Sequence, residues 1–238
     1  MSTVLSIPAS SQPLTIGMLL YPGFTLLDLA GPQAALGLHG RTLLFWKTLE
    51  QVPTDSGISV NPTHTFADAP DALDVLFVPG GMGTNEAMLD PEVVEFLARL
   101  GQRARYVTSV CTGSLLLGMA GLLDGYRAAT HWAAYEALEA LGVTSAPDRV
   151  VADRNRITGG GGTAGIDFGL TLLAELRGDD VAKITQLLME YDPHPPFNTG
   201  HPRVAGELLT QAARAALGED LILNITKIAS ARHTRIEI

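Results

Sequence analysis

Short apolar runs alternate with stretches of helical spacing along most of this chain. Largely apolar segments, typical of buried strands, are predicted at 14–20, 74–78 and 105–110. Further strands are predicted at 41–49, 149–153 and 156–158, with shorter, more exposed ones at 56–60 and 63–66. Apolar residues at helical spacing predict helices at 24–38, 91–104, 113–118, 135–141, 164–176 and 179–190. This alternation predicts an α/β fold in which helices cover both faces of a mostly parallel sheet.

The same pattern divides the chain into three parts. Residues 13–202 are predicted to form the α/β domain, and its first helix contains Pro32, which we expect to kink or break that helix. Residues 1–12, rich in serine, are typical of a flexible leader. A proline-rich stretch at 192–202 is typical of a linker. Residues 203–238 beyond it are predicted to form a helical extension that packs on the domain or mediates dimerisation.

Composition narrows the classes of function. Of the 238 residues, 46% are hydrophobic and 17% are charged, so a well-filled core is expected. The formal net charge of −9, without a cluster of basic residues, argues against a nucleic-acid partner, because the phosphates would be repelled. No apolar run reaches the ~20 residues of a membrane span, and the N-terminus lacks the pattern of a secretory signal. We therefore expect no membrane partner and a cytoplasmic location, with which a single cysteine is compatible.

The single cysteine, Cys111, lies between a predicted strand and a predicted helix. The surrounding sequence, Ser109-Val110-Cys111-Thr112-Gly113, has the small-x-nucleophile-x-glycine form of a nucleophile elbow. Such a turn exposes the side chain above the sheet, and the N–H groups of the following helix favour thiolate over thiol. A lone cysteine is often only a small buried apolar residue, but this position favours a catalytic nucleophile.

A nucleophilic cysteine needs a group that moves a proton, and no histidine is adjacent to it in sequence. Asp28 is the candidate acid, because it lies in the apolar segment Leu26-Leu27-Asp28-Leu29-Ala30 close after the first strand. Burial there would raise the pKa of its carboxyl, so that it holds a proton near neutral pH. The alternative is an exposed aspartate that accepts a hydrogen bond from a neighbouring amide. If the two side chains meet, they form an acid–nucleophile pair.

Parallel strands end at a common edge of the sheet, where ligands bind. Gly80, Gly81 and Cys111 all follow predicted strands, so we expect them to share one cleft. The N–H groups of the two glycines, together with the hydroxyl and N–H group of Thr112, could then bind the substrate and stabilise developing negative charge. A sharp turn for the glycine pair and a plain helix start for Thr112 are the structural alternatives.

Other candidate residues favour structural roles. His131 could border the cleft, but we interpret it as a structural histidine. The Gly159–Gly162 run lacks a Walker lysine and Gly-x-Gly-x-x-Gly spacing, so close packing of a helix on the sheet explains it better than phosphate binding. His194 and His201 have neither a nearby cysteine nor His-x-x-x-His spacing, and we expect no metal site.

Four motifs together resemble the ThiJ/PfpI superfamily. They are Tyr21-Pro22-Gly23-Phe24 with Asp28, Val78-Pro79-Gly80-Gly81, the Ser109–Gly113 elbow, and Ala129-Thr130-His131-Trp132. The resemblance spans roughly residues 14–192 and implies a flavodoxin-like α/β fold with a reactive cysteine at the elbow. Within the superfamily, segments 105–115, 162–168 and 190–197 are similar to the isocyanide (isonitrile) hydratases, which also have Asp and Thr at the positions of Asp28 and Thr112.

This resemblance implies the hydration of an isocyanide to an N-substituted formamide, without a metal or organic cofactor. Cys111 would attack the isocyanide carbon and form a thioimidate, while Asp28 delivers a proton to that carbon. Thr112 and the two glycines would orient the substrate. The resemblance also implies a homodimer. Gly162 departs from the pattern of these hydratases, in which a larger apolar residue is expected at this position. We expect the glycine to loosen the packing beside the cleft and to change the substrate preference.

The alternative function is a non-enzymatic ligand sensor, because related domains occur in AraC-type transcription regulators. Residues 203–238 are too few for the two helix-turn-helix units of such a regulator, and the negative charge is unfavourable for DNA binding. Other enzymes of the superfamily, such as glyoxalases and proteases, typically pair the cysteine with glutamate and often have histidine directly after it. Asp28 and Thr112 argue against these activities.

Overall fold

The computed structural model of the protein describes residues 12–218 and 224–231. Most of the expected leader 1–12 and part of the expected extension 203–238 lie outside the described residues. The strands of the main sheet are β1 (Leu14–Leu19), β2 (Gly40–Trp46), β5 (His64–Thr65), β6 (Val75–Val78), β7 (Tyr106–Val110), β10 (Val150–Asp153) and β11 (Arg156–Gly159). Two further pairs of very short strands are β3 (Val52–Pro53) with β4 (Ser59–Val60), and β8 (Arg127–Ala128) with β9 (Thr144–Ser145).

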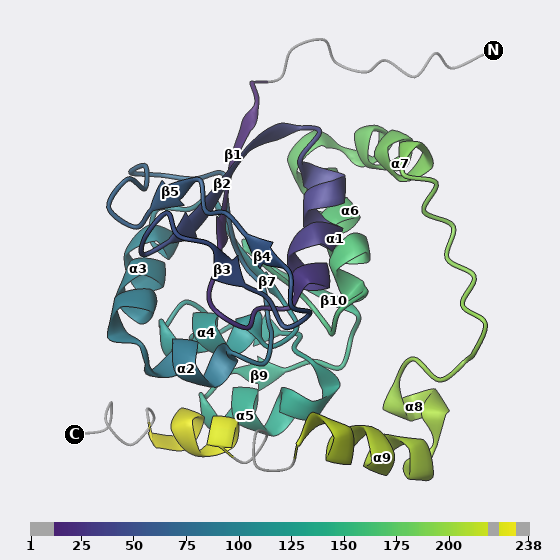
Figure 1. Ribbon diagram of the computed structural model, residues 1–238. Helices are drawn as coiled ribbons and strands as arrows, with labels where there is room; N and C mark the ends of the chain where they lie inside the picture. The colour runs from purple at the N-terminus through teal and green to yellow at the C-terminus, as the bar shows by residue number, and fades with distance from the viewer. Residues whose placement is uncertain (1–11, 219–223, 232–238) are drawn as a thin grey trace, which may run out of the picture.

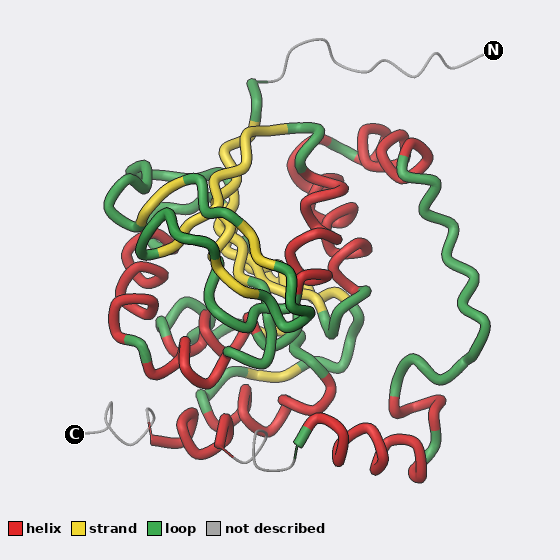
Figure 2. Tube along the Cα trace, viewed as in Figure 1, coloured by secondary structure: helices red, strands yellow, loops and turns green. Residues whose placement is uncertain are grey.

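The main sheet has the strand order β10-β11-β7-β6-β1-β2-β5, and its strands run through the middle of Figure 2 in yellow. Neighbouring strands are parallel, with the exception of the antiparallel pair β10 and β11. All four residues of β6 are buried, as expected for a central strand with both faces covered. The mostly parallel α/β fold predicted from the sequence is therefore confirmed.

Helices cover both faces of this sheet. The helices of the described residues are α1 (Leu26–Leu36), α2 (Thr84–Leu89), α3 (Pro91–Gly101), α4 (Gly113–Met119), α5 (Tyr135–Ala140), α6 (Ala164–Arg177), α7 (Asp179–Leu188), α8 (Pro202–Ala205) and α9 (Glu207–Leu217), with a further helical segment at residues 224–231. Figure 1 shows α1 and α6 packed together on one side of the sheet, with α2, α3 and α4 on the other. The sequence did not predict α2, because the first half of this short helix, Thr84-Asn85-Glu86, is polar and gives no apolar periodicity.

Pro32, at which the sequence predicted a kink or a break, does not break α1. Proline removes one backbone hydrogen bond from a helix interior, which weakens the helix locally. Here α1 packs along α6, and Pro32 itself is buried in α1. The burial of this apolar side offsets the lost hydrogen bond, so the helix continues through Pro32 to Leu36.

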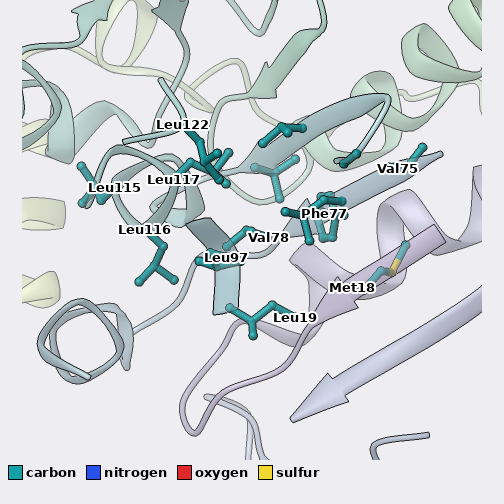
Figure 3. Packing of buried hydrophobic residues seen from close by; sticks show 14 of the residues in the cluster. Met18, Leu19, Val75, Phe77, Val78, Leu97, Leu115, Leu116, Leu117 and Leu122 are labelled. Carbon is teal, nitrogen blue, oxygen red and sulfur yellow. The ribbon is translucent and has the colours of Figure 1, made fainter. Parts of the chain in front are cut away.

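The hydrophobic core fills both sides of the central strands. Figure 3 shows Met18 and Phe77, from β1 and β6, in the same cluster as Leu97 of α3 and Leu116 of α4. Most of these side chains are fully buried. This packing fixes α4 against the ends of β6 and β7, which is where the elbow lies.

Gly113, the first residue of α4, allows this close approach. A Cβ atom at this position would overlap the carbonyl oxygen of Val78 and lie 2.8 Å from that of Pro79. We predict that Gly113→Ala lowers the free energy of unfolding by ~2 kcal/mol or more, because two backbone segments would have to separate. Urea unfolding measures this, with Gly200→Ala as the matched control, since no atom lies within 4 Å of that position. Equal unfolding free energies for the two variants would contradict the interpretation.

Candidate active site

Cys111 lies at a strained turn between β7 and α4. Its φ angle is 55°, in the left-handed region that non-glycine residues rarely adopt. Its backbone N–H donates to the carbonyls of Gly159 (3.1 Å) and Gly160 (2.8 Å). Its carbonyl accepts hydrogen bonds from the hydroxyls of Thr130 (3.1 Å) and Ser114 (3.2 Å). These four bonds hold the cysteine backbone in the elbow conformation that the sequence predicted.

The side chain of Cys111 is partly accessible and faces a cavity of about 260 Å³. Asp28, from the first turn of α1, and Thr112 line the same cavity. Gly81, which follows β6, lies in its wall as well. The structure thus brings together residues that are more than eighty positions apart in the sequence, at the carboxyl ends of neighbouring parallel strands.

Asp28 is buried and only partly hydrogen-bonded. It is 0% exposed, and its Oδ2 accepts a hydrogen bond from the N–H of Gly80 (3.0 Å). Its other oxygen, Oδ1, has no partner of ordinary hydrogen-bond geometry among the described residues. Burial raises the pKa of the carboxyl from 3.8 to about 7, against the opposing effects of the Gly80 N–H and the nearby Cys111 thiol. Asp28 therefore exchanges a proton near neutral pH, as expected from its apolar sequence context.

Burial also raises the pKa of the Cys111 thiol, and the neighbouring Asp28 carboxylate raises it further. The N–H groups of Thr112 and Gly162 lower this pKa, because they favour negative charge on the sulfur. Burial outweighs them, so the thiol is favoured over the thiolate that we expected from the helix N-terminus. Proton loss from sulfur must therefore be coupled to proton uptake by a nearby base, and Asp28 is that neighbour.

The two glycines after β6 have a different role from the one that the sequence suggested. The N–H of Gly80 donates to Asp28, and the N–H of Gly81 donates to the hydroxyl oxygen of Thr112 (3.0 Å). Each N–H carries one hydrogen, so both are used to hold side chains of the site rather than to contact a substrate. The amides that face the sulfur are instead those of Thr112 and Gly162.

Thr112 belongs to a chain of hydroxyl groups. The Thr84 hydroxyl donates to the carbonyl of Gly81 (2.6 Å), and the hydroxyl oxygens of Thr84 and Thr112 are 2.7 Å apart. Since the hydrogen of Thr84 is engaged with Gly81, Thr112 donates to Thr84. The Tyr21 hydroxyl, 3.2 Å from that of Thr84, donates to the carbonyl of Pro79 (2.9 Å). This network fixes the loop after β6 against the elbow.

Sequence reasoning missed the part that Gly162 and Thr84 play at the site. The interpretation as helix packing fits Gly159, since a Cβ there would lie 3.3 Å from the Cβ of Phe168 in α6. In addition, the carbonyls of Gly159 and Gly160 accept from the N–H of Cys111, and the Gly162 N–H faces its sulfur. Gly162 has a φ angle of 39°, in the left-handed region, and an added Cβ would meet only Leu27 at 3.9 Å. Its departure from the expected pattern was the one sequence signal that pointed to this position.

His131 combines the structural role that we expected with a place in the cavity wall. Its Nδ1 accepts a hydrogen bond from the N–H of Ala133 (3.3 Å), which caps the turn Trp132–Ala134. Burial lowers the pKa of its imidazole to about 4, so the ring is neutral at pH 7. With Nδ1 as acceptor, the ring hydrogen lies on Nε2. His131 also lines the cavity that contains Cys111.

Within residues 12–218 and 224–231, no three His, Cys, Asp or Glu side chains are grouped as a metal ion would require. In the same part of the chain, every helix is too short or too polar to cross a membrane.

Comparison with known proteins agrees with this geometry. The family model of the DJ-1/PfpI family, the same grouping as ThiJ/PfpI, matches residues 15–175. The chain belongs to the DJ-1/PfpI family. Among solved structures, it is similar to a ThiJ/PfpI family protein from Pseudomonas syringae, with a TM-score of 0.85 and 46% identity over 93% of this chain and 90% of that one.

Two curated relatives differ in how much of their length is matched. An isonitrile hydratase of Pseudomonas putida is 48% identical over 223 residues, which cover 92% of this chain and 97% of that protein. The HTH-type transcriptional regulator GbdR of Pseudomonas aeruginosa is 35% identical over 195 residues, which cover 78% of this chain and 53% of the regulator. The similarity to the hydratase therefore spans nearly whole proteins, and the similarity to the regulator spans about half of it.

The raised pKa of Asp28 has a consequence for stability. Between about pH 4 and about pH 7, the folded protein retains a proton that the unfolded chain has lost, so stability falls as the pH rises through this window. Asp28→Asn removes this titration. We predict that the variant is close to the wild type in stability near pH 4 and exceeds it by ~4 kcal/mol near pH 8. Urea unfolding at both pH values measures the difference. If the variant is less stable than the wild type near pH 8, burial does not raise the pKa of the Asp28 carboxyl, and the interpretation is wrong.

Proposed function

We propose that this protein is an isocyanide hydratase, which adds water to an isocyanide and releases an N-substituted formamide. The observation that carries the proposal is the pairing of a buried carboxyl, with a pKa of about 7, and a cysteine at an elbow in one cavity. The near full-length similarity to the isonitrile hydratase of Pseudomonas putida supports the same reaction. Cys111 is the nucleophile and Asp28 the acid and base of the mechanism.

In the first half of the reaction, the thiol adds to the isocyanide carbon. The sulfur of Cys111 forms the S–C bond while the Asp28 carboxylate takes the thiol proton and passes it to the same carbon. The isocyanide carbon has a lone pair, so it can accept both the proton and, through its π system, the sulfur. The product is a thioimidate, R–N=CH–S–Cys111. The N–H groups of Thr112 and Gly162 stabilise negative charge on the sulfur as it attacks.

In the second half, water adds to the thioimidate carbon. Asp28 accepts a proton from the attacking water and delivers it to nitrogen, which gives R–NH–CH(OH)–S–Cys111. The C–S bond then breaks, the hydroxyl proton returns to sulfur, and R–NH–CHO leaves. The balance is one isocyanide and one water to one formamide, with Cys111 and Asp28 restored. No step in this sequence uses a metal or an organic cofactor.

We propose further that the protein is a cytoplasmic homodimer. Large apolar side chains on three helical positions support an interface, since Leu187 and Leu208 are each 80% exposed and Leu188 is 72% exposed. They lie on either side of the long extended connection between α7 and α8, which Figure 2 shows in green. A second copy of the chain would cover these leucines.

The second candidate is a ligand-sensing domain without turnover, and the similarity to GbdR favours it. A sensor needs the cavity but does not need a proton donor beside the cysteine. The two functions are separated by whether a bound isocyanide is released as formamide or leaves unchanged.

We predict that the purified protein converts cyclohexyl isocyanide to N-cyclohexylformamide. Cys111→Ala should abolish the conversion, and Asp28→Asn should lower kcat by ~10³-fold or more, because neither proton transfer to carbon nor activation of water then has a base. Formamide is measured by chromatography, and the thioimidate by mass spectrometry of the rapidly quenched protein, which gains the mass of the whole isocyanide. Turnover by Cys111→Ala would exclude the covalent mechanism.

A further inference from the structure

Two apolar side chains from the C-terminal part of the chain line the same cavity as Cys111. Leu217 is the last residue of α9, and Ile225 lies in the helical residues 224–231. Both positions lie beyond residue 175, where the match to the family model ends. This part of the cavity wall therefore comes from a segment that the family match does not cover.

The helix at 224–231 is fixed to the body of the protein by its apolar side. Ile225 is 6% exposed and Ala229 is 0% exposed, and both belong to the main hydrophobic core. In Figure 1 this helix, drawn in yellow, lies beside α5, whose Ala137 lines the cavity together with Ile225. In α9, by contrast, no residue is fully buried. From α9, the last residue, Leu217, lines the cavity.

The cavity combines a small reactive centre with a mainly apolar wall. The apolar lining residues are Met82, Ala133, Ala134, Ala137, Leu217 and Ile225. The acidic side chains are Asp28 and Asp55, His131 is held neutral, and no lysine or arginine of the described residues lines the cavity. A negatively charged substituent would meet carboxyl groups and no cation, whereas a neutral hydrocarbon substituent would be transferred from water to an apolar surface.

We propose that Leu217 and Ile225 select the substrate of this site, which is a neutral isocyanide with an aliphatic or aromatic substituent that fits about 260 Å³. This inference rests on the proposed hydratase activity and adds the residues that select the substituent. An isocyanide group has no hydrogen to donate and accepts a hydrogen bond only at its terminal carbon, so hydrogen bonds distinguish little between one isocyanide and another. Most of the binding free energy therefore comes from contacts between the substituent and the apolar wall.

The test compares kcat/KM for methyl isocyanide, cyclohexyl isocyanide and the isocyanoacetate anion. Leu217→Ala should lower kcat/KM for the cyclohexyl compound by ~10-fold and for the methyl compound much less, because the methyl group is too small to reach this wall. Ile225→Val, which preserves the core, should change the same ratio in the same direction by ~3-fold. Leu89→Ala is the control, since Leu89 is 65% exposed at the end of α2 and does not line the cavity. The wild type should turn over isocyanoacetate more slowly than the cyclohexyl compound.

The outcomes separate this inference from the function on which it rests. If the wild type hydrates isocyanides but Leu217→Ala and Ile225→Val keep the wild-type ratio of cyclohexyl to methyl kcat/KM, as Leu89→Ala should, the inference is overturned and the hydratase remains. A preference for isocyanoacetate over the cyclohexyl compound would overturn it in the same way. If the wild type forms no formamide from any of the three compounds, the proposed function fails together with the inference.

Discussion

The rest of this site depends on one constraint: the carboxylate of Asp28 and the thiol of Cys111 must be held close enough to exchange a proton. In water Asp28 would lose its proton at acidic pH, but burial raises its pKa to about 7. The N–H of Gly80 fixes the carboxyl, and the N–H groups of Thr112 and Gly162 face the sulfur of Cys111. Because carboxyl and thiol are both held near the same cavity, a proton can pass between oxygen, sulfur and a bound carbon atom without crossing solvent.

The fold provides this arrangement through the order of its strands. β1, β6 and β7 are neighbours in the parallel sheet, and they lead into the segments that carry Asp28, Gly80 and Cys111. β11, on the other side of β7, leads into Gly159 and Gly160, whose carbonyls hold the N–H of Cys111. The strained backbone of the cysteine is thus maintained by these bonds, together with those from Thr130 and from Ser114 of α4. The closely packed core beneath the elbow prevents these segments from relaxing.

Local features of the site could be predicted from the sequence, and features that depend on packing could not. The elbow at Cys111 was predictable because the strand, the small residues and the helix are consecutive in the chain. The use of the Gly80 N–H depends on where α1 places Asp28, and the balance at the sulfur depends on how deeply Cys111 is buried. The contribution of Leu217 depends on contacts across more than a hundred residues, which no local pattern encodes.

The central claim is that the pKa of Asp28 lies near 7, so that its carboxyl both takes up and gives off a proton near neutral pH, and infrared difference spectroscopy tests it most directly. A protonated carboxyl has a C=O stretching band that its carboxylate lacks, so the band can be followed as the pH is raised. The account predicts that the wild type loses such a band with a midpoint near pH 7 and that Asp28→Asn does not show it. The account would be contradicted if the wild type lost all its protonated-carboxyl bands near pH 4 and gave the same spectrum as Asp28→Asn above that pH.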